Sequence, residues 1–305
     1  MPGPVWRLTA AYILMMAGTP MMVLLAGIIG TRIAPSPGLA TLPIALVVVG
    51  VACSTLPTGR LLDRFGRRPV FLAYGGVAIL GALLAMHGLA NGSFARFSAS
   101  AFVMGWSGAA GHQYRFAALE SVPPEQAPRA TSFLLLGGVF AAFVGPELAV
   151  RGRALLETEY TGSFLLLIAS YLAGMLLIAG YRDNIAAGAK RSRGGRRVTE
   201  IFRSPTVRIA VLSAAVGYGV MSFIMTATPI NMHVHDGHSL EATKFVIQSH
   251  IAAMYLPALV FPWLHGLLGV RRVIWSGIAV YAFCLAIAWF DNSFLHYWFA
   301  LILLG

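Results

Sequence analysis

The strongest constraint on the fold of this chain is a series of long apolar runs separated by short polar segments. A helix needs about 20 apolar residues to cross the hydrocarbon core of a bilayer. Of the 305 residues, 58% are hydrophobic and 11% are charged, which is too little charge to cover a water-facing surface. We therefore expect an all-α integral membrane protein with spans at roughly 8–30, 39–59, 69–90, 94–114, 129–150, 161–181, 206–232, 242–268 and 271–290.

The spacing of these runs also predicts how the chain is divided. The longest polar stretch, residues 183–205, follows the sixth span and predicts a basic cytoplasmic linker between a six-helix half, residues 1–182, and a second half, residues 206–305. A tenth apolar run begins near residue 294 and ends at Gly305, too short to span a bilayer. We expect the second half to be incomplete, with helices seven to nine and the start of a truncated helix ten.

Basic residues are distributed unevenly between the two sides of the predicted bundle. The formal net charge is +11, but the charges lie in short clusters between apolar runs, so we expect a lipid bilayer and no nucleic acid as partner. Lys and Arg are enriched in cytoplasmic loops. A cytoplasmic N-terminus puts all but five of the 22 Lys and Arg residues on the cytoplasmic side, the exceptions being Arg32, Arg96, Arg151, Arg153 and Lys244.

The sequence contains no catalytic constellation and no nucleotide-binding loop. We therefore expect no enzyme activity and no tightly bound cofactor, and an ion or substrate gradient as the source of energy for any transport. Cys53 and Cys284 lie far apart inside apolar runs, which favours packing over a disulfide or a CxxC metal site. Glu147, near the end of the fifth span, is expected to pair with Arg151 four residues on.

Two residue pairs with the same spacing indicate a metal site. Met221 and Met225 lie in the seventh predicted span, and His250 and Met254 lie in the eighth. Residues four apart share one face of a helix. Two antiparallel neighbouring spans would hold the four side chains at one depth. Thioether and imidazole donors favour Cu(I) over hard cations. The alternative interpretation is that the methionines only fill gaps in the core.

A histidine-rich segment follows the seventh span, at His233, His235 and His238. Neutral imidazole binds many metals, so these residues are candidates for capturing a cation before it enters the protein. The alternative is that the three rings are simply solvated.

The loop between the second and third predicted spans reads Gly59-Arg-Leu-Leu-Asp-Arg-Phe-Gly-Arg-Arg68. It resembles the signature loop of the major facilitator superfamily, G-x-L-x-D-R-x-G-R-R. The resemblance implies two six-helix halves that rock about a site near the middle of the membrane. It also implies that this loop is a conformational switch, built from Gly59, Asp63, Arg64, Gly66, Arg67 and Arg68.

The metal-site pairs resemble one branch of this superfamily, the CcoA-like copper importers, which carry MxxxM in span seven and HxxxM in span eight. This resemblance implies import of copper, as Cu(I), across the bacterial inner membrane through Met221, Met225, His250 and Met254. Riboflavin carriers are close relatives, so a small organic solute such as riboflavin is the alternative substrate. A further alternative is an inactive truncated transporter. The sequence leaves the oligomeric state open.

Overall fold

The structure, a computed structural model, describes residues 3–181 and 198–305, and the regular secondary structure in these residues is helical throughout. Most of the predicted linker, residues 183–197, lies outside the described residues, and the chain beyond it forms a short helix, α9, before the seventh span begins at Pro205. The all-α prediction is therefore confirmed for the described residues.

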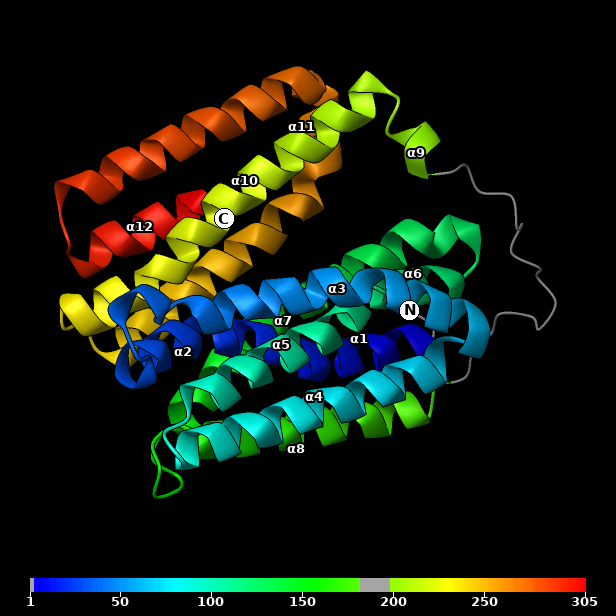
Figure 1. The fold of residues 1–305 in the computed structure, drawn as a ribbon. Coiled ribbons are helices and arrows are strands. Elements are labelled where there is room, and N and C mark those ends of the chain that lie inside the picture. Colours follow the sequence, from blue (N-terminus) through cyan, green and yellow to red (C-terminus); the bar gives the residue numbers. More distant parts are fainter. Residues whose placement is uncertain (1–2, 182–197) are drawn as a thin grey trace.

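The helices follow the order of the apolar runs (Figure 1). The first bundle consists of α1 (Gly3–Met16), α2 (Gly18–Ile33), α3 (Leu42–Phe65), α4 (Arg67–Ala90), α5 (Phe94–Gly111), α6 (Tyr114–Glu120), α7 (Ala127–Gly152) and α8 (Thr161–Ala179). The second consists of α9 (Val198–Ile201), α10 (Pro205–Pro229), α11 (Leu240–Phe290) and α12 (Phe294–Leu304). Short turns of other helix types lie at η1 (Pro37–Leu39), η2 (Pro124–Gln126) and η3 (Ile230–His235).

The first predicted span is interrupted rather than continuous. Helix α1 ends at Met16 and α2 begins at Gly18, with Ala17 between them. Pro20 has no backbone N–H, so the Met16 carbonyl loses the hydrogen bond that a continuous helix would give it, and the proline ring crowds the preceding turn. The proline therefore explains why the break lies one turn before it.

The eighth and ninth predicted spans are joined without a loop. Both belong to the 51-residue element α11, whose helical geometry is broken at Gly269, where φ is 72° and ψ is 162°. Side chains with a Cβ rarely adopt this positive φ, and glycine adopts it readily. The chain turns back at this point, so α11 has two limbs that run side by side with α10 and α12 (Figure 1).

Seven helical stretches in the described residues are long and apolar enough to cross a membrane. They include the interrupted first span, from Gly3 to Ile33, and the stretch from Gly266 to Phe290, which contains the second limb of α11. The runs expected at 94–114 and 242–268 are not among the seven, although they form α5 and the first limb of α11. Helix α5 is rich in serine, glycine and alanine, which lowers its apolarity.

Glycines bring α3 and α5 into backbone contact. A Cβ on Gly50 would lie 2.2 Å from the Phe102 carbonyl oxygen, and a Cβ on Gly105 would lie 2.1 Å from the Val47 carbonyl oxygen. Small residues at helix interfaces allow this close approach, which supplies packing where lipid offers no hydrophobic drive for association. The two helices form one of the most extensive contacts in the first bundle.

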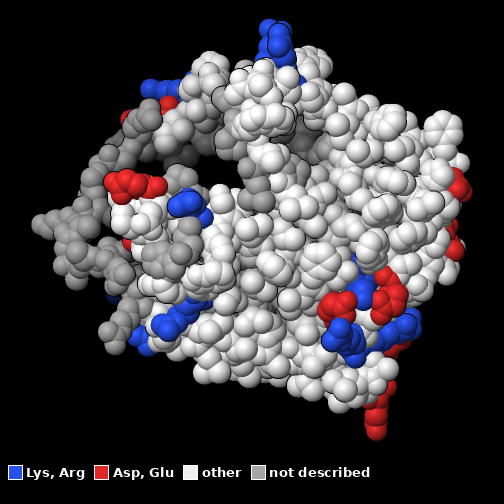
Figure 2. Space-filling model, turned by 180° about the vertical axis from the view of Figure 1, so that it is seen from behind, with Lys and Arg blue, Asp and Glu red and all other residues white. Residues whose placement is uncertain are grey.

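The two bundles meet at one end of the molecule and diverge at the other (Figure 1). At the closed end, Gly27 of α2 faces Ile230 of η3, and Glu147 of α7 faces Lys244 of α11. The open end carries the turns at Gly66 and Gly269. Figure 2 shows the hollow between the bundles from behind, on a surface that is mostly uncharged, with Lys, Arg, Asp and Glu gathered in a few small groups.

Candidate functional site

The seam between the two bundles is formed mainly by α7 and the first limb of α11, which run antiparallel. From the closed end inwards, Lys244 Nζ lies 2.7 Å from a Glu147 carboxylate oxygen, and the buried Gln248 side chain donates a hydrogen bond to the Phe143 carbonyl, 3.2 Å away. The Glu147–Arg151 pair expected from the sequence is confirmed, with an N–O distance of 3.0 Å. Lys244 is the additional partner that the spacing within α7 does not reveal.

A pair of tyrosines marks the inner limit of the described contacts across this seam. Gly138 of α7 lies so close to Tyr255 of α11 that a Cβ there would be 2.5 Å from the Tyr255 ring. Tyr12 of α1 rests against the neighbouring Gly137, and its hydroxyl is close enough to Tyr255 for the two side chains to interact. The described contacts across the seam therefore end at two phenols, one from each half.

The positive charge of Arg115, on α6, is near enough to act electrostatically on the Tyr12 hydroxyl. Arg115 itself is exposed, and its guanidinium lies over the Phe116 ring, 4.8 Å from the centroid. The inner end of the seam thus combines aromatic surface, two hydroxyl groups and a nearby cation. These are the groups that can orient a ligand with a flat apolar body and polar edges.

Three of the four residues of the predicted metal site, Met221, His250 and Met254, lie against α12. Met221 and Met254 pack in one apolar cluster with Cys284 and two α12 residues, whereas Met225 packs against a different, larger cluster. His250 is fully buried, and its Nδ1 donates a hydrogen bond to the Leu301 carbonyl, 2.8 Å away. Its Nε2 has no hydrogen-bond partner in the described part of the chain. Binding of one ion by all four side chains stays a prediction.

The predicted capture segment is folded back by hydrogen bonds. Nδ1 of His233 lies 2.8 Å from the His238 carbonyl oxygen, and Nε2 of His238 lies 2.9 Å from the Asn292 carbonyl oxygen. His235 is exposed. Within residues 3–181 and 198–305, no group of three or more His, Cys, Asp or Glu side chains is arranged to hold a metal ion. A capture role for the three histidines stays a prediction.

The predicted switch loop forms the junction of α3 and α4. Gly59 lies on α3, Asp63 and Arg64 are exposed in its last turn, and Gly66 between the helices has a φ of 83°. Arg68 is exposed, but Arg67 is only 3% exposed.

Arg67 makes a bidentate ion pair with Glu120 at the end of α6, with both N–O distances 2.6 Å. Planar guanidinium and carboxylate groups pair strongly in this geometry. Sequence analysis missed Glu120, because its separation from Arg67 is set by the packing of α4 against α5 and α6. The pair ties the beginning of α4 to the segment that carries Arg115.

A second charged group joins the ends of α2, α7 and α8 within the first bundle. Glu159 accepts hydrogen bonds from both Arg32 and Arg153, and the two guanidinium groups lie 5.5 and 5.7 Å from the centre of the Tyr160 ring. Partial burial opposes ionisation of Glu159, but the two arginines outweigh it and lower the pKa of this carboxyl.

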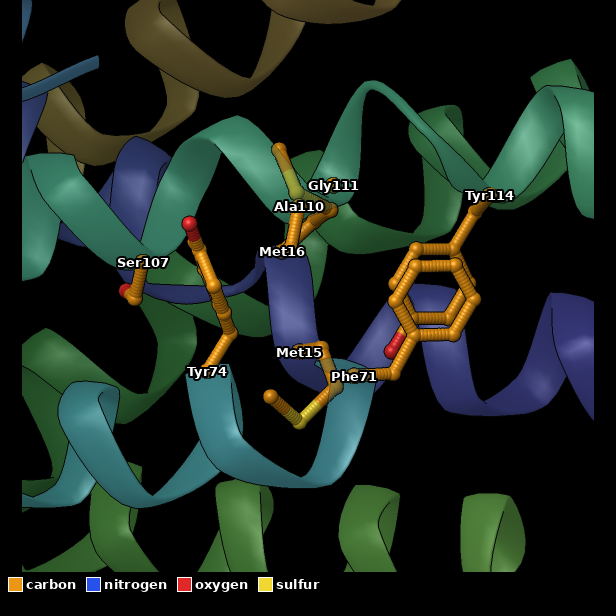
Figure 3. A pocket seen from close by; sticks show the side chains of 8 residues that line it. All are labelled: Met15, Met16, Phe71, Tyr74, Ser107, Ala110, Gly111 and Tyr114. Atoms are coloured by element: carbon orange, nitrogen blue, oxygen red, sulfur yellow. The ribbon is translucent and has the colours of Figure 1, made fainter. Parts of the chain in front are cut away.

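The methionines of the interrupted span line a small cavity inside the first bundle (Figure 3). The cavity offers about 10 Å³ to the centre of a water-sized sphere, which is room for roughly one water molecule. It is therefore too small for an organic solute and lies away from the seam. Its lining residues are Met15, Met16, Phe71, Tyr74, Ser107, Ala110, Gly111 and Tyr114.

Comparisons with known proteins agree with this architecture. Residues 8–305 match the model of the family described as Major Facilitator Superfamily. The chain is 32% identical over 304 residues to the riboflavin transporter RfnT of Brucella anthropi, covering 98% of this chain and 75% of that protein. It is 33% identical over 264 residues to YdeG of Bacillus subtilis, described as an uncharacterized MFS-type transporter, and spans 60% of that protein.

Solved structures with the same fold are also transporters. The nucleoside transporter NupG superposes with a TM-score of 0.73 at 12% identity, covering 100% of this chain and 79% of NupG. A bacterial homolog of the human lysosomal transporter Spinster, in an inward-facing and unoccupied conformation, gives a TM-score of 0.68 at 16% identity and covers 99% and 72%. The family match and the helical architecture together show that this multi-pass membrane protein belongs to the major facilitator superfamily of transporters.

Proposed function

We propose that this protein is a secondary transporter for a small organic solute of the riboflavin class. The observation that carries the proposal is the 32% identity to a riboflavin transporter along 98% of the chain. The sequence first suggested copper as the substrate, because two residue pairs resemble those of copper importers. The comparisons with known proteins do not support copper. The organic solute, which the motifs left as an alternative, is therefore the better-supported substrate.

The seam supports a binding site for such a solute. Riboflavin carries a flat aromatic ring system with hydrogen-bonding edges and a polar hydroxylated chain. Tyr12 and Tyr255 offer aromatic rings and hydroxyl groups at the inner end of the described seam. Sites of this kind are mostly apolar, with a few polar groups that fix orientation. We propose that these two residues contact the solute.

Transport by this protein would follow alternating access, in which the two halves rock about a site between them. We propose that it lies in the bacterial inner membrane with its N-terminus in the cytoplasm, as the distribution of Lys and Arg indicates. The hollow at the open end would then face the cytoplasm. The Gly59–Arg68 segment would lie on the same side and switch between the two states.

Uptake of radiolabelled riboflavin by cells that cannot make the vitamin tests this function. Cells that produce the protein should accumulate label, and excess unlabelled riboflavin should block it. Tyr12→Phe and Tyr255→Phe should each raise KM, because each removes one hydroxyl from the proposed site. Tyr160→Phe is the matched control, since the buried Tyr160 ring lies in the charged group away from the seam.

Accumulation no higher than in cells without the protein would refute the proposal. Liposomes containing the purified protein separate transport from other effects, and would also reveal the inactive truncated protein that the sequence leaves as an alternative. Equal KM values for all three tyrosine variants and the parent would leave transport standing but exclude the proposed contacts.

Copper is a second candidate because of one feature of His250. A metal-binding histidine usually donates its other ring N–H to a carbonyl or carboxylate, which orients the free nitrogen. His250 donates Nδ1–H to the Leu301 carbonyl, and its buried Nε2 has no partner in the described residues. Met221 and Met254 pack against the same helix, α12.

Measurement of copper accumulation under reducing conditions tests this candidate. His250→Gln should abolish it while leaving riboflavin uptake unchanged, and Met86→Leu, a methionine outside the predicted site, serves as control. Equal copper accumulation in His250→Gln and the parent would exclude copper transport through His250.

A further inference from the structure

Four charged side chains cross the seam at the closed end. Glu147 and Arg151 lie on α7, and Glu241 and Lys244 lie on α11. Lys244 contacts both carboxylates, at 2.7 Å from Glu147 and 2.5 Å from Glu241, and its side chain is only 12% exposed. The Glu147–Lys244 pair joins the two halves, whereas the other ion pairs between described residues each lie within one half.

Each side of the seam is electrically neutral. On α7, Glu147 is balanced by Arg151 four residues on, and on α11, Lys244 is balanced by Glu241 three residues before it. Like charges therefore oppose each other across the seam as well, Glu241 against Glu147 and Arg151 against Lys244. The net attraction between the halves comes from the direct Glu147–Lys244 contact, and the flanking charges reduce it.

This arrangement also limits the cost of separating the halves. Removing the partner of a buried charge is strongly destabilising when no other partner remains. When α7 and α11 part, Lys244 keeps Glu241 and Glu147 keeps Arg151, so neither central charge is left alone. An ion pair without flanking partners would hold the two halves together more permanently.

We propose that Glu147 and Lys244 form a latch that holds the closed end shut, and that Arg151 and Glu241 weaken this latch enough for the transport cycle to open it. The hydrogen bond from Gln248 to the Phe143 carbonyl, one turn further in, closes with the latch. The proposal concerns the movement of the two halves and does not depend on which solute is carried.

The charges predict effects of opposite sign for the two kinds of residue. Glu147→Gln leaves α7 with a net positive charge facing Lys244, and Lys244→Met leaves α11 with a net negative charge facing Glu147. Both changes favour the open latch. Glu241→Gln removes a like-charge repulsion across the seam and leaves α11 with a net positive charge facing Glu147. Arg151→Gln does the same in the opposite sense and leaves α7 with a net negative charge facing Lys244. Both of these changes favour the closed latch.

Labelling of a half-buried thiol at the closed end measures the state of the latch without any substrate. Ile230→Cys places a thiol where Ile230 packs against Gly27 at the closed end, in a background that carries Cys53→Ser and Cys284→Ala. The purified protein in nanodiscs is treated with a polar maleimide, and the rate of labelling is followed. Ser36→Cys, in the exposed turn after α2, serves as a control thiol that should react at the same rate in every variant.

Relative to the parent, Glu147→Gln and Lys244→Met should each raise the labelling rate at position 230 by about tenfold, between the effects typical of exposed and of buried pairs. Glu241→Gln and Arg151→Gln should each lower it by about threefold, as expected for exposed charges. Glu147→Gln and Lys244→Met change different helices, so a folding defect in one variant would not affect the result from the other.

Changes of the same sign in all four variants, or unchanged labelling in both latch variants, would overturn the proposal. Because the assay contains no solute, these results are independent of the riboflavin uptake test. If riboflavin transport failed but the labelling rate still rose in the two latch variants and fell in the other two, the latch proposal would stand. Only the proposed substrate would then be rejected.

Discussion

Replacing Gly105 by alanine is a direct test of how closely α3 and α5 approach. The new methyl group would lie 2.1 Å from the Val47 carbonyl oxygen, and that oxygen belongs to the backbone of α3. Carbon and oxygen atoms normally stay about 3.3 Å apart. The two helices must therefore move apart by about 1 Å at this point. Overpacking of this kind costs about 1–3 kcal/mol.

Alanine also brings a gain, because it favours a helix over glycine by about 0.5–1 kcal/mol. We therefore expect Gly105→Ala to destabilise the protein by about 1–2 kcal/mol net. Gly76→Ala on α4 is the matched control, since no atom lies within 4 Å of a Cβ at that position. The control should show the helix gain without the clash.

Unfolding in mixed detergent micelles, followed by far-UV circular dichroism, measures both variants against the parent protein. The expected order of stability is Gly76→Ala, equal to or above the parent, and then Gly105→Ala below both. If Gly105→Ala proved as stable as Gly76→Ala, the backbone contact between α3 and α5 would be refuted.

Other features of the structure lead to predictions for single variants. The pKa of Glu159 is lower in the folded protein than in the unfolded chain, so its stabilising effect is present at neutral pH and is lost as pH falls through the folded pKa. Glu159→Gln should therefore be less stable than the parent at pH 7, and thermal unfolding should show this difference shrinking as the pH falls below about 4.5. Arg67→Lys keeps the charge but loses the bidentate pair with Glu120, and hydrogen exchange in α6 should become faster, whereas Arg68→Lys should leave it unchanged. Tyr114→Phe removes a buried hydroxyl without a hydrogen-bond partner in the described residues, so stability in the detergent assay should stay equal or rise, and a loss above about 1 kcal/mol would contradict this.

Much of the fold follows from local properties of the sequence. Apolar length predicts where the helices lie, and Gly59–Arg68 predicts the tight junction of α3 and α4. The break before Pro20 and the turn at Gly269 also depend on single residues, but hydropathy alone does not predict either of them. The available signals were a proline inside an apolar run and a glycine two residues before Arg271.

The seam was less accessible from the sequence, because its contacts join residues about a hundred positions apart. Glu147 and Arg151 were paired correctly by their spacing, but Lys244 could be assigned only after α7 and α11 were placed together. A useful signal was present: charged residues inside apolar runs are costly and usually have a partner. Tyr12 and Tyr255 carried no comparable signal, since aromatic residues are common in any membrane helix.

The single non-helical residue at Gly269 has a mechanical consequence for α11. A flexible connection would let one limb tilt while the other stayed in place. Here one non-helical residue separates the two limbs, so a tilt of the first limb displaces the start of the second limb, which carries Trp275 and Phe283. The point where the two limbs meet lies at the open end of the molecule, opposite the ion pairs of the closed end.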